Sequence, residues 1–349
     1  MSSDDRLFEI IRDLVMRHAP SGIEMEIDAR LYECFAEVGV TLEADAAGNL
    51  VGRIPGRGGG RLAITAHKDE IGAIVTSLEN EGRVRVRKLG GSHPWVYGEG
   101  IVDLLGERAV VSGVLSFGSR HVAHGMASQP PHESTLPRWT DAWIETKCSP
   151  AELADARVRP GTRMVVGRHR KAPFRLKRHI ASYALDNRAS LAILLELARR
   201  VKSPVPDLTL VLTAKEEMGA VGGLFHTRNN VVDALIALEI VPLAAEYPVE
   251  DTPSPVLLEA DGHGLYDDAL NSVLRRAAAR ADIALQSAVL SRFGSDASIA
   301  MRHGHVPRGA CLGFPTQNTH GYEIAHLGAI ENCVRTLQAL SEETLTFGV

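Results

Sequence analysis

Seven ionisable side chains end or interrupt the apolar runs of this 349-residue sequence. They are His67, Asp69, Asp186, Glu216, Glu217, Glu239 and His320. Imidazole and carboxylate groups are ligands that suit zinc, cobalt or manganese. Two such ions about 3.5–4 Å apart can share one bridging carboxylate and one water molecule, whose pKa they lower. The residue types therefore predict a site that holds two divalent metal ions per subunit and activates water for hydrolysis.

Hydrolysis of this kind also requires a carboxylate that binds no metal, because a base must accept the proton of the water and pass it to the leaving group. The adjacent Glu216 and Glu217 can divide these tasks, with one binding metal and the other facing the water. Asp69 lies two residues after His67, so the two side chains share a face if the strand geometry continues. Asp69 could then orient the imidazole from behind.

Each of these residues alone has a plainer interpretation. A single histidine at a strand end is more often a capping or surface residue. Asp186 could simply cap the helix that follows it, and Glu216 and Glu217 could be exposed charges in a turn. Glu239 is harder to explain in this way, since a carboxylate inside the apolar run LIALEIVP requires a partner or a metal. The seven residues together are more specific than any one of them.

The sequence also predicts the sheet that would bring these residues together. Strand-like runs lie near 41–45, 50–54, 61–66, 207–214, 234–240 and 306–314, and helical patterns lie at 187–201, 265–282 and 326–343. This alternation predicts an α/β fold with a mostly parallel sheet covered by helices. Sites in such sheets form outside the carboxyl ends of the strands.

Two further helices are predicted near the amino terminus. The first covers residues 4–18, where apolar and charged residues alternate at helical spacing. The second extends to about residue 39 and is predicted to begin with a capping box made by Ser21 and Glu24.

Residues 75–177 have a different pattern from the rest of the chain. Val and Arg alternate in GRVRVRKL, and Gly and Pro separate the short strand-like runs, which predicts a small inserted β-rich domain. The catalytic domain would then comprise residues 1–74 and 178–349. A polar, Pro-rich loop at 118–137 has the length of a functional or mobile segment. Its histidines are interpreted as solvated rather than metal-binding; they are His121, His124 and His132.

Charge and cysteine content bear on which partners and metal sites the protein could have. The formal net charge of −5 argues against a nucleic-acid partner, since such proteins usually carry a basic face. The four cysteines form no C-x-x-C pair, so a thiolate zinc site is not expected and the thiols are interpreted as reduced. No apolar run reaches the ~18 residues of a membrane span, and the amino terminus does not resemble a signal peptide. A cytoplasmic location is expected.

These stretches resemble a known family, the two-metal aminopeptidases that include the tetrahedral, glutamyl and deblocking aminopeptidases. The matching motifs follow the family's order through almost the whole chain: HAPSGIE (18–24), GNL (48–50), AHKDEIG (66–72), GG (90–91), RPG (159–161), ALDNR (184–188), AKEEMG (214–219), ALEIV (237–241), GSDA (294–297) and PTQNTHGYE (315–323). The stretch NTHGYE (318–323) is also similar to a bacterial subgroup associated with the osmoprotectant N-acetylglutaminylglutamine amide.

The resemblance implies a zinc-peptidase-like catalytic domain that removes amino-terminal residues from short peptides. The inserted β-rich domain would mediate homo-oligomers from dimers to tetrahedral dodecamers. Each of the seven residues then takes a role. His67 and Glu239 match terminal ligands of one metal, and Glu217 and His320 match those of the other. Asp186 matches the bridging ligand, Glu216 the general base, and Asp69 the carboxylate behind the first histidine.

The sequence departs from the family at three of these places. Lys68 stands where the family usually has Met, Glu239 where it usually has Asp, and His320 is followed by Gly-Tyr-Glu rather than Ser-Pro. A longer carboxylate can still bind metal, but it shifts the geometry and with it the preferred ion. The changed neighbourhood of His320 bears more on the substrate preference than on the chemistry.

Two other functions are open on the sequence alone. The departures at Glu239 and around His320 would suit a non-catalytic binding or assembly protein that retains the fold. Paired carboxylates also cleave glycosides, although 5% aromatic residues and histidine ligands argue against a sugar groove. Three simpler roles are predicted elsewhere: Asp296 caps its helix, His303 and His305 complement a helix carboxyl end, and His326 begins a helix.

Overall fold

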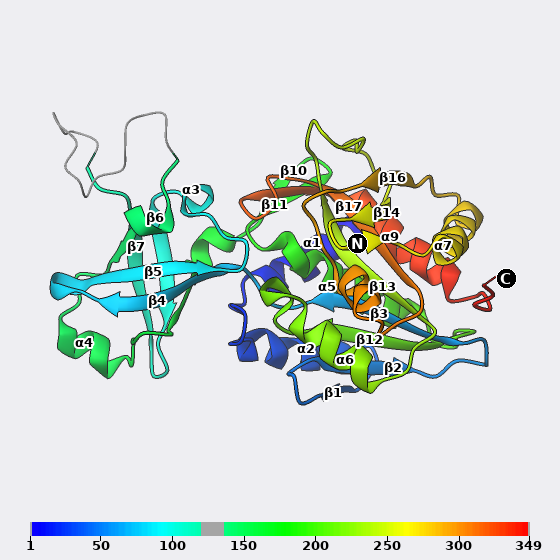
Figure 1. Cartoon of the computed structure of the whole chain (residues 1–349), viewed down its shortest axis with the longest axis horizontal. Coiled ribbons are helices and arrows are strands. Elements are labelled where there is room, and N and C mark those ends of the chain that lie inside the picture. Colours follow the sequence, from blue (N-terminus) through cyan, green and yellow to red (C-terminus); the bar gives the residue numbers. More distant parts are fainter. Residues whose placement is uncertain (1, 120–135, 348–349) are drawn as a thin grey trace.

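The computed structural model describes residues 2–119 and 136–347 of the chain. The described strands form a 12-stranded mixed sheet and a separate closed barrel. In Figure 1 the barrel occupies one end of the long axis, and the large sheet with its helices occupies the other. This arrangement confirms the predicted α/β fold with an inserted β-rich unit. His121, His124 and His132, with most of their predicted loop, lie outside the described residues.

The large sheet has a parallel centre. Strands β12 (Asp207–Thr213), β3 (Arg61–His67), β13 (Ala234–Pro242) and β17 (Gly309–Gln317) lie side by side in that order, and each adjacent pair is parallel. Strands buried on both faces require nearly continuous apolar sequence, which LAITA in β3 and ALIAL in β13 provide. Their carboxyl ends consequently form one edge.

Antiparallel strands extend the sheet on both sides. The outer members are β1 (Leu42–Ala44), β2 (Leu50–Ile54), β18 (Glu323–His326), β11 (His179–Ser182) and β10 (Phe174–Leu176). A branch beside β17 contains β14 (Val256–Asp261), β15 (Gly264–Leu265) and β16 (Gln286–Val289).

Helices cover both faces of the large sheet. One face carries α1 (Ser3–Val15), α2 (Met25–Glu37), α5 (Leu185–Arg200), α7 (Asp268–Arg280) and α9 (Leu327–Leu340). The other face carries α6 (Val221–Asn229) and α8 (Asp296–Arg302). The alternation of side chains along β13 serves both cores: Ile236 and Leu238 lie in the first, and Leu235 and Ala237 in the second.

The barrel has its own apolar core. Its strands follow one another in the order β4 (Gly72–Leu78), β5 (Arg83–Leu89), β8 (Trp143–Glu145), β7 (Val110–Ser116), β6 (Gly100–Leu105) and β9 (Arg163–Val166). Two short helices accompany it, α3 (Pro94–Tyr97) and α4 (Pro150–Asp155). The boundaries of a 75–177 domain and its role in assembly stay predictions.

Two predicted helix caps are wrong, the Ser21–Glu24 capping box and the cap at Asp296, and so is the alternative interpretation of Asp186 as a cap. Glu24 is the N-cap residue of α2 but its side chain caps nothing, and the Ser21 hydroxyl bonds Asp69 instead. Ser295, rather than Asp296, caps α8. The N-cap residue of α5 is Ala184, so the capping interpretation of Asp186 also fails. In each case a distant partner recruits the polar side chain that local spacing assigned to a cap.

The predictions for His326 and His303 agree with the helix ends, whereas Nδ1 of His305 lies 3.3 Å from the hydroxyl of Thr227 in α6. His326 is the N-cap residue of α9 and its ring accepts a bond from the amide of Gly328. His303 is the C-cap residue of α8, with its Nδ1 2.9 Å from the carbonyl of Ile299.

We expect Leu238→Ala to lower the free energy of unfolding by about 2–5 kcal/mol. Leu238 is fully buried in the central strand β13, so the shorter side chain leaves a cavity beneath the sheet. Denaturant unfolding followed by far-UV circular dichroism measures the change. Leu265→Ala is the matched control, because Leu265 is 78% exposed and its truncation should cost less than about 0.5 kcal/mol.

Candidate metal centre

The carboxyl edge of the parallel strands gathers the predicted site residues. His67 is the last residue of β3, and Glu239 lies within β13 near its end. Glu216 and Glu217 begin a short 3-10 turn, Glu216–Met218, that follows β12. His320 lies in the turn between β17 and β18. Residues separated by up to 253 positions therefore meet because parallel strands end at the same edge.

The first group of ligand atoms surrounds the imidazole of His67. Its Nε2 lies 2.9 Å from Oδ1 of Asp186 and 3.9 Å from Oε2 of Glu239. One atom from each of the three residues lies within 4.8 Å of the others. All three side chains are less than a tenth exposed. One imidazole and two carboxylates at this spacing could hold one cation.

The second group shares Asp186 with the first. Oδ2 of Asp186 lies 3.5 Å from Nε2 of His320, and the same nitrogen lies 3.8 Å from Oε1 of Glu217. These three atoms also lie within 4.8 Å of one another. Each oxygen of the Asp186 carboxylate thus faces a different group, as a ligand bridging two cations would.

The charge balance of the two groups suits divalent cations. Burial raises the pKa of Glu239 well above its ordinary value, against the opposing effect of His67. Burial likewise raises the pKa of Glu217 to about 7, with His320 opposing the rise and Asp186 adding to it. Burial lowers the pKa of His320, but Asp186 and Glu217 outweigh it and bring the value to about 10. Burying several carboxylates close together costs free energy, and bound metal ions reduce that cost by neutralising the negative charge. The donor set therefore fits the predicted ions.

Glu216 lies outside both groups. Its backbone amide donates to Oδ1 of Asp69 at 2.9 Å, and the amide of Glu217 donates to Oδ2 at 3.3 Å. Burial raises the pKa of the Glu216 carboxyl well above its ordinary value, with Asp296 and Glu217 adding to the rise and His67 opposing it. A carboxylate with a raised proton affinity, placed beside two candidate metal sites, is suited to proton transfer.

Asp69 lies close to His67, but most of its bonds go elsewhere. The Nδ1 atom of His67 is 3.1 Å from the Asp69 carbonyl oxygen and 3.5 Å from its Oδ1. The same carboxylate accepts the hydroxyl of Ser21 at 2.6 Å besides the two amides of the glutamate turn. Asp69 is therefore placed both to orient the imidazole and to fix the glutamate turn.

Sequence reasoning gave no role to two residues that hold this centre in shape. Glu323 accepts the amide of His320 with one oxygen and the amide of Asp186 with the other, both at 3.0 Å. Asn187 donates to Oε2 of Glu239 at 3.0 Å and to the carbonyl of Leu238 at 2.7 Å. Both belong to stretches that match the family, ALDNR (184–188) and PTQNTHGYE (315–323), and this match was the signal that could have found them.

A cavity of about 670 Å³ opens above the two groups. Besides the metal-group residues it is lined by His93, His263, Arg292 and Phe293. A peptide's terminal residue could therefore approach the candidate ions from this side.

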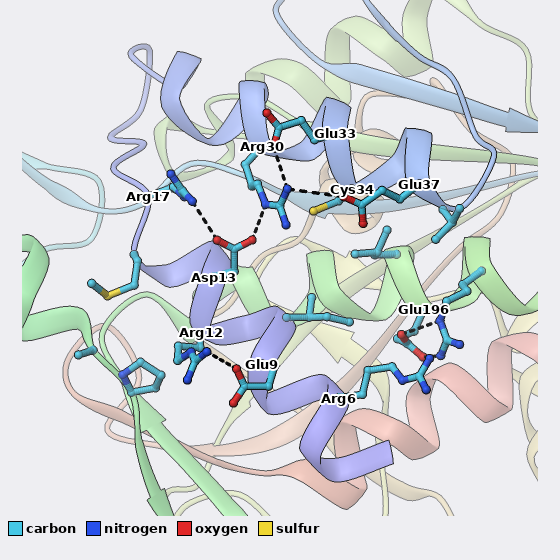
Figure 2. A pocket seen from close by; sticks show the side chains of 17 residues that line it. Arg6, Glu9, Arg12, Asp13, Arg17, Arg30, Glu33, Cys34, Glu37 and Glu196 are labelled. Carbon is cyan, nitrogen blue, oxygen red and sulfur yellow. Dashed lines mark hydrogen bonds and ion pairs between the residues drawn. The ribbon is translucent and has the colours of Figure 1, made fainter. Parts of the chain in front are cut away.

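A larger cavity, of about 890 Å³, lies among α1, α2 and α5 on the outside of the molecule (Figure 2). Its charged side chains pair with one another, as Arg17 does with Asp13 at 3.0 Å and Arg30 with Glu33 at 2.7 Å. Among the described residues, no group of histidines and carboxylates suited to a metal lies there. The two groups that could hold a metal in the described residues both lie at the strand edge.

The fold and the donor set define a metal-dependent hydrolase of the α/β type. The model of the M42 glutamyl aminopeptidase family matches residues 48–336, so the chain belongs to that family. It is a metal-dependent aminopeptidase and therefore acts on the amino end of peptides. This confirms the predicted family and reaction, and the subgroup suggested by NTHGYE stays a prediction. In the described part of the chain, no helix has the length and apolar character needed to cross a bilayer.

Individual relatives agree with the family. The chain is 24% identical to lysyl aminopeptidase of Pyrococcus furiosus, over 96% of this chain and 97% of that one. It is 26% identical to glutamyl aminopeptidase of Lactococcus lactis, over 68% and 67%. The solved structure of the TET1 peptidase of Pyrococcus horikoshii superposes with a TM-score of 0.85 at 23% identity and covers 97% of this chain and 99% of that one. The last comparison establishes the shared fold.

Proposed function

We propose that this aminopeptidase uses two divalent ions, zinc, cobalt or manganese, held by the two groups at the strand edge. His67 and Glu239 would hold one ion as terminal ligands, and Glu217 and His320 would hold the other. Asp186 would contribute one oxygen to each group. The observation that carries this assignment is the orientation of the Asp186 carboxylate, whose two oxygens face different imidazoles at 2.9 and 3.5 Å.

The side chains then divide the reaction between them. Divalent ions held by these groups would lower the pKa of a water molecule and polarise the scissile carbonyl. Glu216, which belongs to neither group, accepts the water proton and delivers it to the leaving amine. Asp69 keeps Glu216 in place through the backbone of the turn. The peptide enters through the 670 Å³ cavity with its free amine near the ions.

Membership of the aminopeptidase family favours this function over the two alternatives, a glycosidase and a non-catalytic binding protein. Assays with amino-acyl chromogenic substrates beside a polysaccharide distinguish the three. A panel of amino-acyl anilides would also show which terminal side chain the cavity accepts.

We expect Glu216→Gln to lower kcat by ~10²–10⁴-fold, because glutamine keeps the shape of the side chain but accepts no proton. Bound metal should stay at the wild-type level, since Glu216 is not a ligand. Amino-acyl anilide hydrolysis and metal analysis of the same sample measure the two quantities. Glu246→Gln, on the exposed surface, is the control and should retain full activity. Wild-type turnover in Glu216→Gln would show that the base is wrongly assigned.

We expect a chelator to abolish activity and a divalent metal salt to restore it. Asp186→Asn should reduce bound metal at both positions, because this one carboxylate belongs to both groups. Metal per subunit is measured by mass spectrometry after dialysis. Asp251→Asn, which alters a carboxylate paired with His179, serves as control and should keep the wild-type metal content. Two tightly bound ions per subunit in Asp186→Asn would rule out the bridging role.

We also propose that the chain forms homo-oligomers, between a dimer and a tetrahedral dodecamer, and that the barrel supplies contacts. The Pyrococcus horikoshii TET1 peptidase can assemble into a tetrahedron or a large octahedral shell. In this chain, Ile101 and Val114 lie opposite each other on β6 and β7 and are 39% and 43% exposed. Paired apolar side chains on a barrel surface are suited to subunit contact.

We expect light scattering to give a mass at least twice that of one chain. Val114→Lys should shift the population toward smaller species, because a lysine in an apolar contact must be desolvated. Val231→Lys is the control, since Val231 is 74% exposed on the catalytic part. A wild-type protein with the mass of one chain would contradict assembly, and an unchanged mass for Val114→Lys would contradict the role of this barrel surface.

A further inference from the structure

The turn that carries Glu216 is held by its backbone at three consecutive residues. The amides of Glu216 and Glu217 donate to the Asp69 carboxylate. The preceding amide, that of Lys215, donates to Oε1 of Glu24 at 3.2 Å. Lys215 itself has a left-handed backbone conformation, with φ of 55°. Two buried carboxylates therefore fix the direction in which the Glu216 side chain leaves the backbone.

Glu24 is in turn held by a buried ammonium. The Nζ atom of Lys68 lies 3.0 Å from Oε2 of Glu24 and forms a second ion pair with Asp28. Lys68 is 1% exposed, although lysine is almost never so deeply buried without a partner. The preceding residue, His67, faces Asp186 in the candidate centre, whereas the Lys68 ammonium lies against Glu24 and Asp28 at the start of α2.

The ammonium balances a local excess of negative charge. Burial raises the pKa of Glu24, and the nearby Asp69 carboxylate adds to the rise, whereas Lys68 lowers it. An ionised carboxylate accepts a shorter and stronger bond from an amide than a neutral one does. Lys68 thereby supports the bonds that Glu24 accepts from the amides of Lys215 and Gly22, the latter at 3.0 Å.

We propose that Lys68 is a positioning residue for the base. It holds Glu24, Glu24 holds the backbone amide of Lys215, and this backbone sets the direction of the Glu216 side chain. The inference rests on the proposed role of Glu216. Catalysis requires the base within hydrogen-bond reach of the water proton, and a misplacement of about 1 Å can cost about 10²-fold in rate. Among the described residues, the Lys68 ammonium pairs with Glu24 and Asp28 and with no member of the two metal groups.

Lys68→Met keeps the length of the side chain and removes its charge. The experiment measures its effect on kcat in the otherwise wild-type enzyme and in the Glu216→Gln variant. In the otherwise wild-type enzyme, we expect kcat for an amino-acyl anilide to fall by about tenfold or more, while KM and bound metal change less than about twofold. In the Glu216→Gln background, the same change should alter the residual kcat less than about twofold, because the group that Lys68 positions is already lost.

Two further variants test the route through Glu24. Glu24→Gln should lower kcat in the same way as Lys68→Met, and the double variant should be no slower than either single one by more than about twofold. Lys68→Arg keeps the charge and should recover part of the rate. Lys202→Met is the control. Among the described residues, its ammonium contacts only the carbonyls of Val38 and Ala198, so its loss should leave kcat unchanged.

An unchanged kcat in folded, metal-loaded Lys68→Met would overturn the proposal. An equal loss of rate in the Glu216→Gln background would overturn it as well, since Lys68 would then act on something other than the base. If Lys68→Met does not fold, folded Glu24→Gln decides, and wild-type kcat in that variant overturns the proposal. Failure of the proposed function is distinct from all of these results, because it appears as full activity of Glu216→Gln itself.

Discussion

The burial of several carboxylates at one edge of a sheet is the constraint on which the rest of this structure depends. Asp69, Asp186, Glu239 and Glu323 are each less than a tenth exposed, and they lie where four parallel strands end. Desolvated carboxylates repel one another and must be neutralised or hydrogen-bonded. Most contacts around the centre either neutralise one of these carboxylates or donate a hydrogen bond to it.

The carboxylates around the centre differ in whether they accept hydrogen bonds from backbone amides. Asp69, Glu24 and Glu323 accept backbone amides, and each thereby fixes a loop that carries a site residue. Among the described residues, the carboxylates of Glu216 and Glu217 accept no such amide. A group whose oxygens are already occupied can position its neighbours, while a group with free oxygens can bind a cation or move a proton. For Glu216 and Glu217, this difference supports the proposed roles of base and ligand.

The sequence was sufficient to predict the sheet and the set of ionisable residues at its edge, because both depend on local patterns. Apolar runs of strand length ended at His67 and before Glu216, and both positions lie at the predicted edge. The supporting contacts could not be predicted in this way. Ser21 and Glu24 have the spacing of a capping box, yet their side chains bond Asp69 and the amide of Lys215. Those partners lie 48 and 191 positions away, and only the folded chain brings them near.

Four consecutive residues, 67–70, connect the centre to the rest of the molecule. All four are at most 4% exposed, and each has a different partner. His67 faces Asp186, Lys68 pairs with Glu24, and Asp69 holds the glutamate turn. Glu70 binds the ammonium of Lys171, which follows the last barrel strand, at 2.6 and 2.7 Å.

A chain of buried polar contacts leads from Glu70 through Lys171 and His18 to the barrel. Nζ of Lys171 lies 3.2 Å from Nδ1 of His18, whose other nitrogen lies 3.1 Å from Asp103 of β6. Removing one partner from such a buried chain of charges leaves another charge unpaired, which is costly. Apolar packing tolerates small sliding movements, whereas paired charges with fixed bond directions do not. The barrel side and the turn that carries Glu216 therefore both contact the same four-residue segment, 67–70, so a shift of either one would alter the contacts of that segment.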